Sequence, residues 1–195
     1  EPIAIAYAAA QARAVLGKRP KRVRIEVSGN IIKNVKSVIV PHTGSMHGIA
    51  AAAAAGIIAG REDRELEVLS EVTQAQIEEM RAYLKEAAFE IRPIDSPFIF
   101  DIRITVCADG DQATARIVGS HTNLVQLLHG TTRIIDRPCS ETVSERRTDR
   151  SILTVERIVD FADSLCPEDV QELFERQISY NMAIAEAGLS GAYGA

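Results

Sequence analysis

The feature that most constrains the fold is an alanine-rich segment that follows a short polar loop. Residues 48–59 consist only of alanine, glycine and isoleucine, and residues 41–47 before them are mainly polar. Such a segment favours a helix that lies very close to its neighbours, because methyl side chains keep backbones near one another. Its N-terminal amides would point back into the polar loop and favour an anion such as a carboxylate. The segment therefore indicates a small-molecule site rather than a nucleic-acid groove.

Composition narrows the class of protein. The chain has 195 residues, of which 46% are hydrophobic and 25% charged, which is typical of a globular chain of one good-sized domain or two small ones. Its net charge of -5 provides no basic field for nucleic acid. No apolar run approaches the roughly 20 residues that span a bilayer, and no signal peptide is recognisable. We therefore expect a cytoplasmic protein with neither nucleic acid nor membrane as a partner.

The cysteines also bear on the compartment. Cys107, Cys139 and Cys166 are odd in number and widely spaced, which fits a reducing compartment and argues against a disulfide framework or a zinc site. Cys107 falls in a strand pattern and is expected in the core. The other two adjoin prolines and are expected in loops or at helix boundaries.

Hydrophobic periodicity predicts the order of helices and strands. Residues 2–16, 46–59, 73–89, 152–161 and 167–187 are expected to be helical, with Thr73 as an N-cap. Strands are expected at 23–27, 90–94, 98–106, 112–121, 124–128 and 131–136, with a further extended piece at 36–40. Asp109-Gly110 is a strong hairpin signal between two of them. The last predicted helix should bury a stripe formed by Val170, Leu173, Phe174, Ile178, Met182, Ile184 and Ala185.

These elements predict an α+β fold, with an antiparallel β-meander sheet covered by alanine-rich helices and a C-terminal helical segment. Residues 1–138 would form a substrate-binding domain, 139–150 a linker and 151–187 the helical segment. The glycine-rich residues 188–195 would begin a linker to a missing C-terminal domain. The second face of the sheet would be either solvated or in contact with that domain.

A basic cluster lies between the first helix and the first strand. Lys18, Arg19, Lys21, Arg22 and Arg24 surround Pro20. The cluster fits either a solvated turn or an anion site, and the turn is the simpler interpretation.

Three polar clusters interrupt apolar surroundings, and the first follows the first predicted strand. Asn30, Lys33 and Asn34 supply two amides and an ammonium within five residues, directly after Ser28. Such groups can bind a carboxylate and hydroxyl or amino groups. The alternative is a plain turn built from turn-forming residues.

The second cluster is the loop before the alanine-rich helix. Gly44 would let the backbone approach a ligand, and His42 could shuttle a proton near neutral pH. The alternative is a loop in which Thr43 or Ser45 merely caps the next helix.

The third cluster runs from Gly119 to Asn123 between two strands. His121, Thr122 and Asn123 stand in a row of polar residues within an apolar sheet. They indicate either a bulge that aims side chains at a site or a plain connection between strands.

The order of these clusters resembles that of the L-cysteine desulfidase family, which is related to the alpha chain of iron–sulfur L-serine dehydratases. The similarity covers nearly the whole chain and corresponds to the N-terminal part of the family's proteins. The motifs that carry it are Glu-Pro-Ile-Ala at 1–4, Ser-x-Asn-x-x-Lys-Asn at 28–34, Val-Pro-x-Thr-Gly at 40–44, Gly-x-His-Thr-Asn at 119–123 and Gly-Leu-Ser-Gly at 188–191.

The resemblance implies a lyase that converts L-cysteine to pyruvate, ammonia and sulfide, or L-serine to pyruvate, ammonia and water. A [4Fe–4S] cluster would act as Lewis acid in the full-length protein, with its ligands outside this chain, so that this part alone would be inactive. Lys33 and His121 would be catalytic. The substrate would be held by Ser28, Asn30, Asn34, His42, Thr43, Gly44, Thr122 and Asn123. Position 42 is often small or an amide in that family, so His42 departs from its pattern.

Two further functions stay open. The chain could be a module that binds a small amino acid or organic acid without chemistry, or a structural domain that contacts other subunits. Its alanine surfaces suggest contact with a missing C-terminal domain or chain, or with a second copy in a homo-oligomer.

Overall fold

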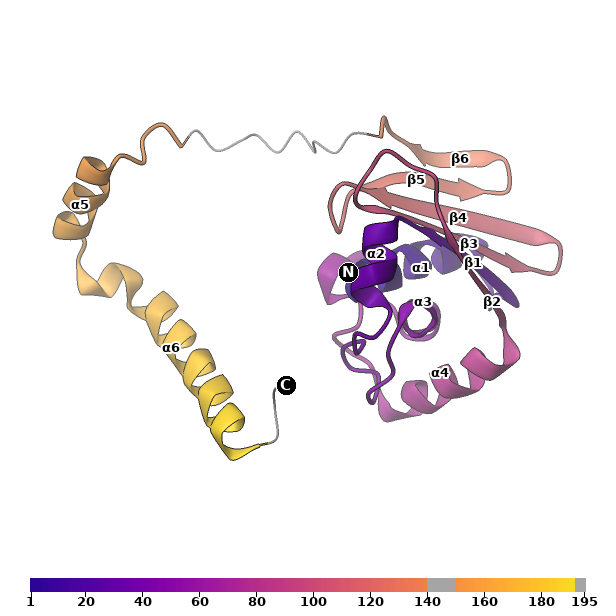
Figure 1. The fold of residues 1–195 in the computed structure, drawn as a ribbon, viewed down its shortest axis with the longest axis horizontal. Coiled ribbons are helices and arrows are strands. Elements are labelled where there is room, and N and C mark those ends of the chain that lie inside the picture. The colour runs from indigo at the N-terminus through magenta and orange to yellow at the C-terminus, as the bar shows by residue number, and fades with distance from the viewer. Residues whose placement is uncertain (140–149, 192–195) are drawn as a thin grey trace. The chain divides into compact units, whose positions relative to one another are not determined.

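The computed structural model describes residues 1–139 and 150–191. The chain divides into two compact units, Glu1–Glu145 and Arg146–Ala195. The first unit holds a sheet and its covering helices, and the second holds two helices (Figure 1).

The centre of the first unit is a buried pair of alanine-rich helices. α1 (Pro2–Leu16) contacts the sheet on one side and α3 (Ile49–Ile58) on the other. Most residues of both helices are buried and none is exposed, because their side chains are small enough for a helix to be enclosed on all sides. The predicted close packing of the alanine-rich segment is confirmed.

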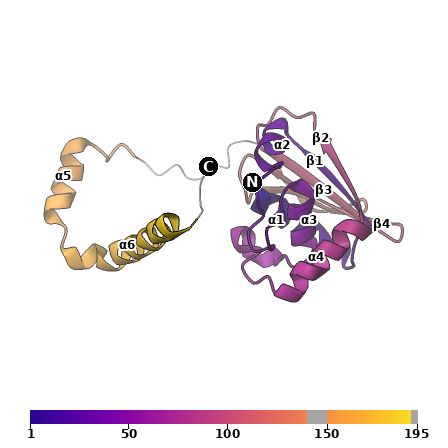
Figure 2. The same ribbon diagram turned by 60° about the horizontal axis from the view of Figure 1, so that its bottom comes forward.

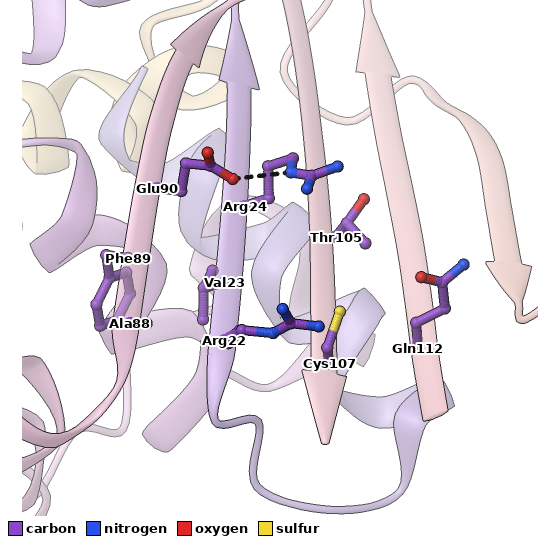
Figure 3. Close-up of a pocket in the computed structure, with 9 residues that line it drawn as sticks. All are labelled: Arg22, Val23, Arg24, Ala88, Phe89, Glu90, Thr105, Cys107 and Gln112. Carbon is purple, nitrogen blue, oxygen red and sulfur yellow. Dashed lines mark hydrogen bonds and ion pairs between the residues drawn. The ribbon is translucent and has the colours of Figure 1, made fainter. Parts of the chain in front are cut away.

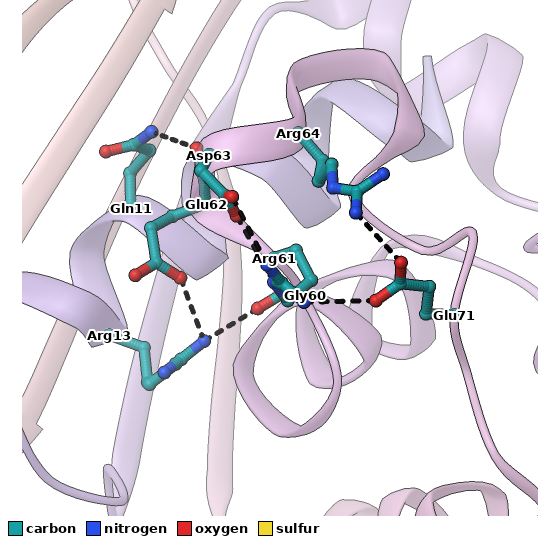
Figure 4. A network of polar contacts seen from close by, with 8 residues as sticks. All are labelled: Gln11, Arg13, Gly60, Arg61, Glu62, Asp63, Arg64 and Glu71. Carbon is teal, nitrogen blue, oxygen red and sulfur yellow. Dashed lines mark hydrogen bonds and ion pairs between the residues drawn. The ribbon is translucent and has the colours of Figure 1, made fainter.

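The C-terminal ends of these two helices are held by a polar network (Figure 4). The guanidinium of Arg13 donates to the carbonyl oxygen of Gly60 at 2.7 Å, and the amide of Gln11 donates to that of Glu62 at 2.9 Å. Both side chains satisfy carbonyls beyond the end of α3, in the turn that leads into a 3-10 helix (Glu62–Glu67). Gly17 ends α1 in the left-handed conformation, with φ of 70°.

The sheet has six strands in the order β2-β1-β3-β4-β5-β6. Their bounds are β1 Arg22–Val27, β2 Ala88–Pro93, β3 Asp101–Ala108, β4 Asp111–Val118, β5 Leu124–His129 and β6 Thr132–Asp136. The expected meander is confirmed from β3 to β6, and Asp109 and Gly110 form its first hairpin with positive φ angles.

The sheet is mixed and not purely antiparallel, which corrects the prediction. β1 pairs with β3 in antiparallel fashion but with β2 in parallel, with Arg22 opposite Ala88 and Val27 opposite Pro93. The chain between these parallel strands forms α2 (Gly29–Val35), α3 and α4 (Gln74–Glu86). A parallel neighbour requires such a crossover, which returns the chain to the same end of the sheet.

Helices cover one face of the sheet. Figures 1 and 2 show α1, α2, α3 and α4 on the same side of it. Alternate residues of β1 and β3, such as Ile25 and Ile104, point toward α1 and are fully buried. Their neighbours Arg24 and Thr105 occupy the opposite face. Cys107 lies on that opposite face and is half-buried, which corrects its predicted place in the core.

One local prediction is confirmed by the structure and another is corrected. Thr73 caps α4 as expected, and its partner Gln76 completes a capping box in which each side chain bonds the other residue's backbone. Residues 36–40 form no strand, and only Ile39 makes an isolated bridge, to His47. The two ends of a tight loop pair with each other there, so residues 36–40 do not join the sheet.

The second unit contains α5 (Val155–Ser164) and α6 (Pro167–Ser190). α6 begins with a proline in its first turn, as predicted, and continues to Ser190. The stripe expected to be buried is mostly exposed, with Leu173, Phe174 and Ile178 at 51–65% exposure. Helical spacing reveals that an apolar face exists but not that a partner covers it. The predicted linker, residues 139–150, lies outside the described residues except for its two end positions.

Within the described residues, no helix is both long and apolar enough to cross a lipid bilayer.

Candidate functional site

The first polar cluster contacts the start of α1. The side-chain amide of Asn34, from α2, donates a hydrogen bond of 3.2 Å to the carboxylate of Glu1. The amides of Ile3 and Ala4 lie in the first turn of α1, where no intrahelical acceptor is available. The side chain of Glu1 does not cap them, and Pro2 has no N–H to offer. The start of α1 therefore combines a carboxylate, an amide and the positive end of a helix dipole.

His121, in the connection between β4 and β5, lies near enough to Glu1 for the carboxylate to influence its pKa. Its imidazole packs against the ring of Phe100, with the two centroids 4.7 Å apart. Partial burial, the largest cause, lowers the pKa of His121 below its ordinary value of 6.5, and the carboxylate of Glu1 acts in the opposite direction. The lowered pKa favours the neutral imidazole, which can accept a hydrogen bond.

Asn30 and Lys33 lie on the same short helix as Asn34 and are exposed to solvent. Neither side chain makes a hydrogen bond or ion pair with another described residue, so both are free to bind a ligand. The structure forms a short helix, α2, at this cluster, and the binding role stays a prediction.

Ser28 makes two structural hydrogen bonds in the same region. Its hydroxyl donates to the carbonyl oxygen of Ile99 at 2.6 Å, and its backbone amide donates to that of Asp101 at 2.9 Å. Asp101 is completely buried and accepts two hydrogen bonds from the guanidinium of Arg116, at 3.0 and 2.6 Å. The bonds of Ser28 fasten the end of β1 to the start of β3, at the point where α2 begins, and those of Arg116 tie β3 to β4.

The second cluster, before α3, lies against α4 instead. Thr43 is buried, and its hydroxyl donates to the carbonyl oxygen of Val40 at 2.7 Å, which closes the loop on itself. Gly44 has φ of 64° and accepts a hydrogen bond from Arg81. His42 is exposed on this turn with φ of 59°. This loop shapes the entry to α3, and among the described residues no hydrogen bond or ion pair joins it to Glu1 or Asn34.

The two remaining residues of the third cluster shape its loop. The amide of Asn123 donates to the carbonyl oxygen of Val118 at 2.7 Å, and Gly119 opens the loop with φ of 78°. Thr122 is half-buried beside it. This hydrogen bond gives the loop the curvature that carries His121 toward Phe100.

Sequence reasoning missed Glu1 and Phe100 as parts of the site. Glu1 precedes a proline at a helix start and Phe100 precedes a strand, so each has an obvious local role. Their place in the site depends on contacts with residues 33 and 21 positions away along the chain, which no local motif reveals.

The residues present do not fit a metal cluster. Among the described residues, no group of three or more His, Cys, Asp or Glu side chains could hold a metal ion. Cys107 is half-buried on the sheet, whereas Cys139 and Cys166 are exposed. We therefore derive no step through an iron–sulfur cluster.

Comparison with known proteins finds relatives along the whole chain. A UPF0597 protein of Desulfitobacterium hafniense is 50% identical over 195 residues, and one of Treponema denticola is 43% identical over the same length. A third, from Fusobacterium nucleatum, is 37% identical. The chain is covered completely, but it spans only 45–46% of the length of these relatives. No family model matches the chain, and no solved structure matches it.

These relatives contradict the resemblance drawn from the motifs. The proteins that align with the entire chain carry the name UPF0597 and are not named L-cysteine desulfidase or L-serine dehydratase. The five short motifs were individually unspecific, and small and polar residues of these types recur wherever loops meet helices. The assignment to the L-cysteine desulfidase family is therefore corrected.

Proposed function

We propose that this chain is the part of a longer protein that binds a small α-amino acid at the start of α1. The observation that carries the proposal is the hydrogen bond between Asn34 and Glu1 at the first turn of α1, with His121 near enough for the carboxylate of Glu1 to influence its pKa. The carboxylate of Glu1 supplies negative charge, and the first turn of α1 supplies positive partial charge beside it. A zwitterion requires that combination, whereas a simple anion does not.

The ammonium of the amino acid would pair with the carboxylate of Glu1. Glu1 already accepts one hydrogen bond from Asn34, and a carboxylate has further acceptor capacity. The neutral imidazole of His121 would accept a second hydrogen bond from the same ammonium. A keto acid lacks this ammonium and would leave both acceptors without a partner.

The carboxylate of the amino acid would face positive groups. The amides of Ile3 and Ala4 form the positive end of α1. Lys33 adds an exposed ammonium, and Asn30 adds an exposed amide. Each of these groups is a donor at pH 7, so together they suit an acceptor-only ligand group.

Calorimetric titration of the chain with L-serine, L-cysteine and pyruvate tests the proposal. We expect heat of binding from the two amino acids and none from pyruvate. Lys33→Gln should weaken binding about tenfold, since it removes a charge-assisted contact to the ligand carboxylate. Lys85→Gln on α4 is the matched control, because it removes an equally exposed lysine far along the sequence from the site.

Two results would overturn the proposal. The first is equal binding of pyruvate and the amino acids, which would show that the ammonium is not recognised. The second is equal weakening by Lys33→Gln and Lys85→Gln, which would reduce the effect of Lys33 to a change of net charge.

A further inference from the structure

The face of the sheet opposite α1 holds a hollow at the end of β1 farthest from Ser28. Its cavity volume is about 350 Å³, which is within the range of small-molecule sites. Figure 3 shows the strands that form its floor, β2, β1, β3 and β4, with the side chains of Arg22, Arg24, Cys107 and Gln112 on it. Arg22 begins β1 whereas Ser28 follows its last residue, so the hollow is separate from the proposed amino-acid site.

Arg22 is the unpaired cation of this hollow. Arg24 pairs with Glu90 at 3.0 Å, and Lys21 pairs with Asp109 at 2.6 Å. The guanidinium of Arg22 makes no ion pair or hydrogen bond with any residue that the structure describes. Arg22 lies directly opposite Cys107 in the register of β1 and β3, and Figure 3 shows its guanidinium beside the sulfur of Cys107.

Uncharged hydrogen-bond donors lie near Arg22 in the same hollow. Gln112 lies opposite Cys107 on β4 and is exposed, and its side-chain amide makes no hydrogen bond to another described residue. Thr105 and Thr114 share a hydrogen bond of 3.0 Å between their hydroxyls. One hydroxyl of such a pair donates to the other, so the accepting hydroxyl keeps a proton that it can donate to a ligand.

We propose that this hollow binds the carboxylate or phosphate group of a small molecule, with Arg22 as the anchoring residue. The planar fork of a guanidinium matches both groups through two parallel N–H donors. Because Glu90 is already engaged by Arg24, its negative charge is balanced within the hollow. The positive charge of Arg22 is therefore available to a ligand.

Cys107 provides a direct readout, since an occupied hollow would shield its sulfur. The chain is treated with iodoacetamide in the presence of inorganic phosphate, succinate or chloride at one ionic strength, and alkylation is followed by mass spectrometry. We expect phosphate or succinate to slow alkylation of Cys107 several-fold relative to chloride. The exposed thiols of Cys139 and Cys166 are internal controls, and their rates should not change.

Two variants separate a site from a general charge effect. Arg22→Gln should abolish the protection of Cys107. Arg92→Gln removes the same charge from β2, where Arg92 pairs with Glu90, and should leave the protection intact. Circular dichroism of both variants verifies that they fold.

Each outcome decides between interpretations. Protection by phosphate alone supports a phosphate site, protection by succinate alone a carboxylate site, and protection by both an oxyanion site without preference. Absence of protection by either ion overturns the proposal. Protection that survives Arg22→Gln overturns it as well, because the anchor would then be another group.

Discussion

Gly56 of α3 lies directly against the backbone of Ala6 in α1. A Cβ atom added to Gly56 would come within 2.7 Å of the carbonyl carbon of Ala6, and closer still to its oxygen. One turn later, a Cβ on Gly60 would lie 2.8 Å from that of Ala10. The contacts advance in the same direction along both helices, so α1 and α3 run parallel and begin at the same end of the domain.

Gly56→Ala should severely destabilise the first unit. The new methyl group cannot be accommodated without moving a backbone that is packed on the sheet, so the cost should exceed the roughly 1–3 kcal/mol of ordinary overpacking. Denaturation by urea, followed by circular dichroism, measures the loss, and failure to fold would agree with the prediction.

Gly29→Ala is the control for the helix propensity of alanine. Gly29 begins α2, and nothing lies within 4 Å of a Cβ built there. We expect a change of less than about 1 kcal/mol, because alanine only reduces the freedom of the unfolded chain. Equal effects at the two glycines would refute the close contact between Gly56 and Ala6.

The buried pair of Asp101 and Arg116 should be strongly coupled. Asp101→Asn or Arg116→Met leaves the other partner without its counter-charge inside the protein, which costs about 3–5 kcal/mol. The double variant should cost less than the sum of the two single ones. A double-mutant cycle by urea denaturation measures this coupling free energy.

An exposed pair provides the comparison for that cycle. Lys21 and Asp109 lie 2.6 Å apart, but their side chains are 75% and 59% exposed. Solvent screens such a pair, so its own cycle should show no measurable coupling. Coupling at Lys21–Asp109 as strong as that at Asp101–Arg116 would mean that burial does not govern the effect.

The parts of the fold predicted correctly from the sequence are those with a local cause. Thr73 and Gln76 cap α4 through bonds that span three residues, and Asp109-Gly110 turns the chain within two. The alternation of β3 fixed which residues face α1, since successive strand side chains point to opposite faces. In each case the deciding interaction lies within a few positions of the motif.

The parts that the sequence did not reveal depend on distant contacts. Arg22 lies opposite Ala88 in the register of the parallel strands β1 and β2, and no motif in either strand specifies that the two strands are neighbours. The candidate site depends in the same way on the contact between Glu1 and Asn34. The polar clusters were visible in the sequence and their binding role stays a prediction, whereas packing determined which of their residues contact distant partners, such as Asn34 with Glu1.

Tyr83 should titrate well above the ordinary range of tyrosine. Burial, the largest cause, raises its pKa to about 12, with the hydroxyl donating to the carbonyl oxygen of Pro20 at 2.9 Å. The folded state thus favours the protonated phenol. The contribution of Tyr83 to the free energy of unfolding is fully present below the ordinary pKa of 10 and is lost as the pH rises toward 12.

Tyr83→Phe isolates this titration. The difference in tyrosinate absorbance between the parent and the variant should have its midpoint near 12, and a midpoint near 10 would contradict the burial of Tyr83. The variant should also lose about 1–3 kcal/mol of stability below pH 10, since the carbonyl of Pro20 loses its donor.

His121 should protonate at lower pH than an ordinary histidine. Packing against Phe100 disfavours the imidazolium, so the unfolded chain binds a proton at this position more readily than the folded one. The contribution of His121 to the free energy of unfolding is therefore present above pH 6.5 and declines as the pH falls below it.

Proton NMR of the imidazole gives the pKa of His121 directly. Phe100→Ala should raise that pKa toward its ordinary value, because it exposes the ring, and an unchanged pKa would show that Phe100 is not the group that excludes water from His121.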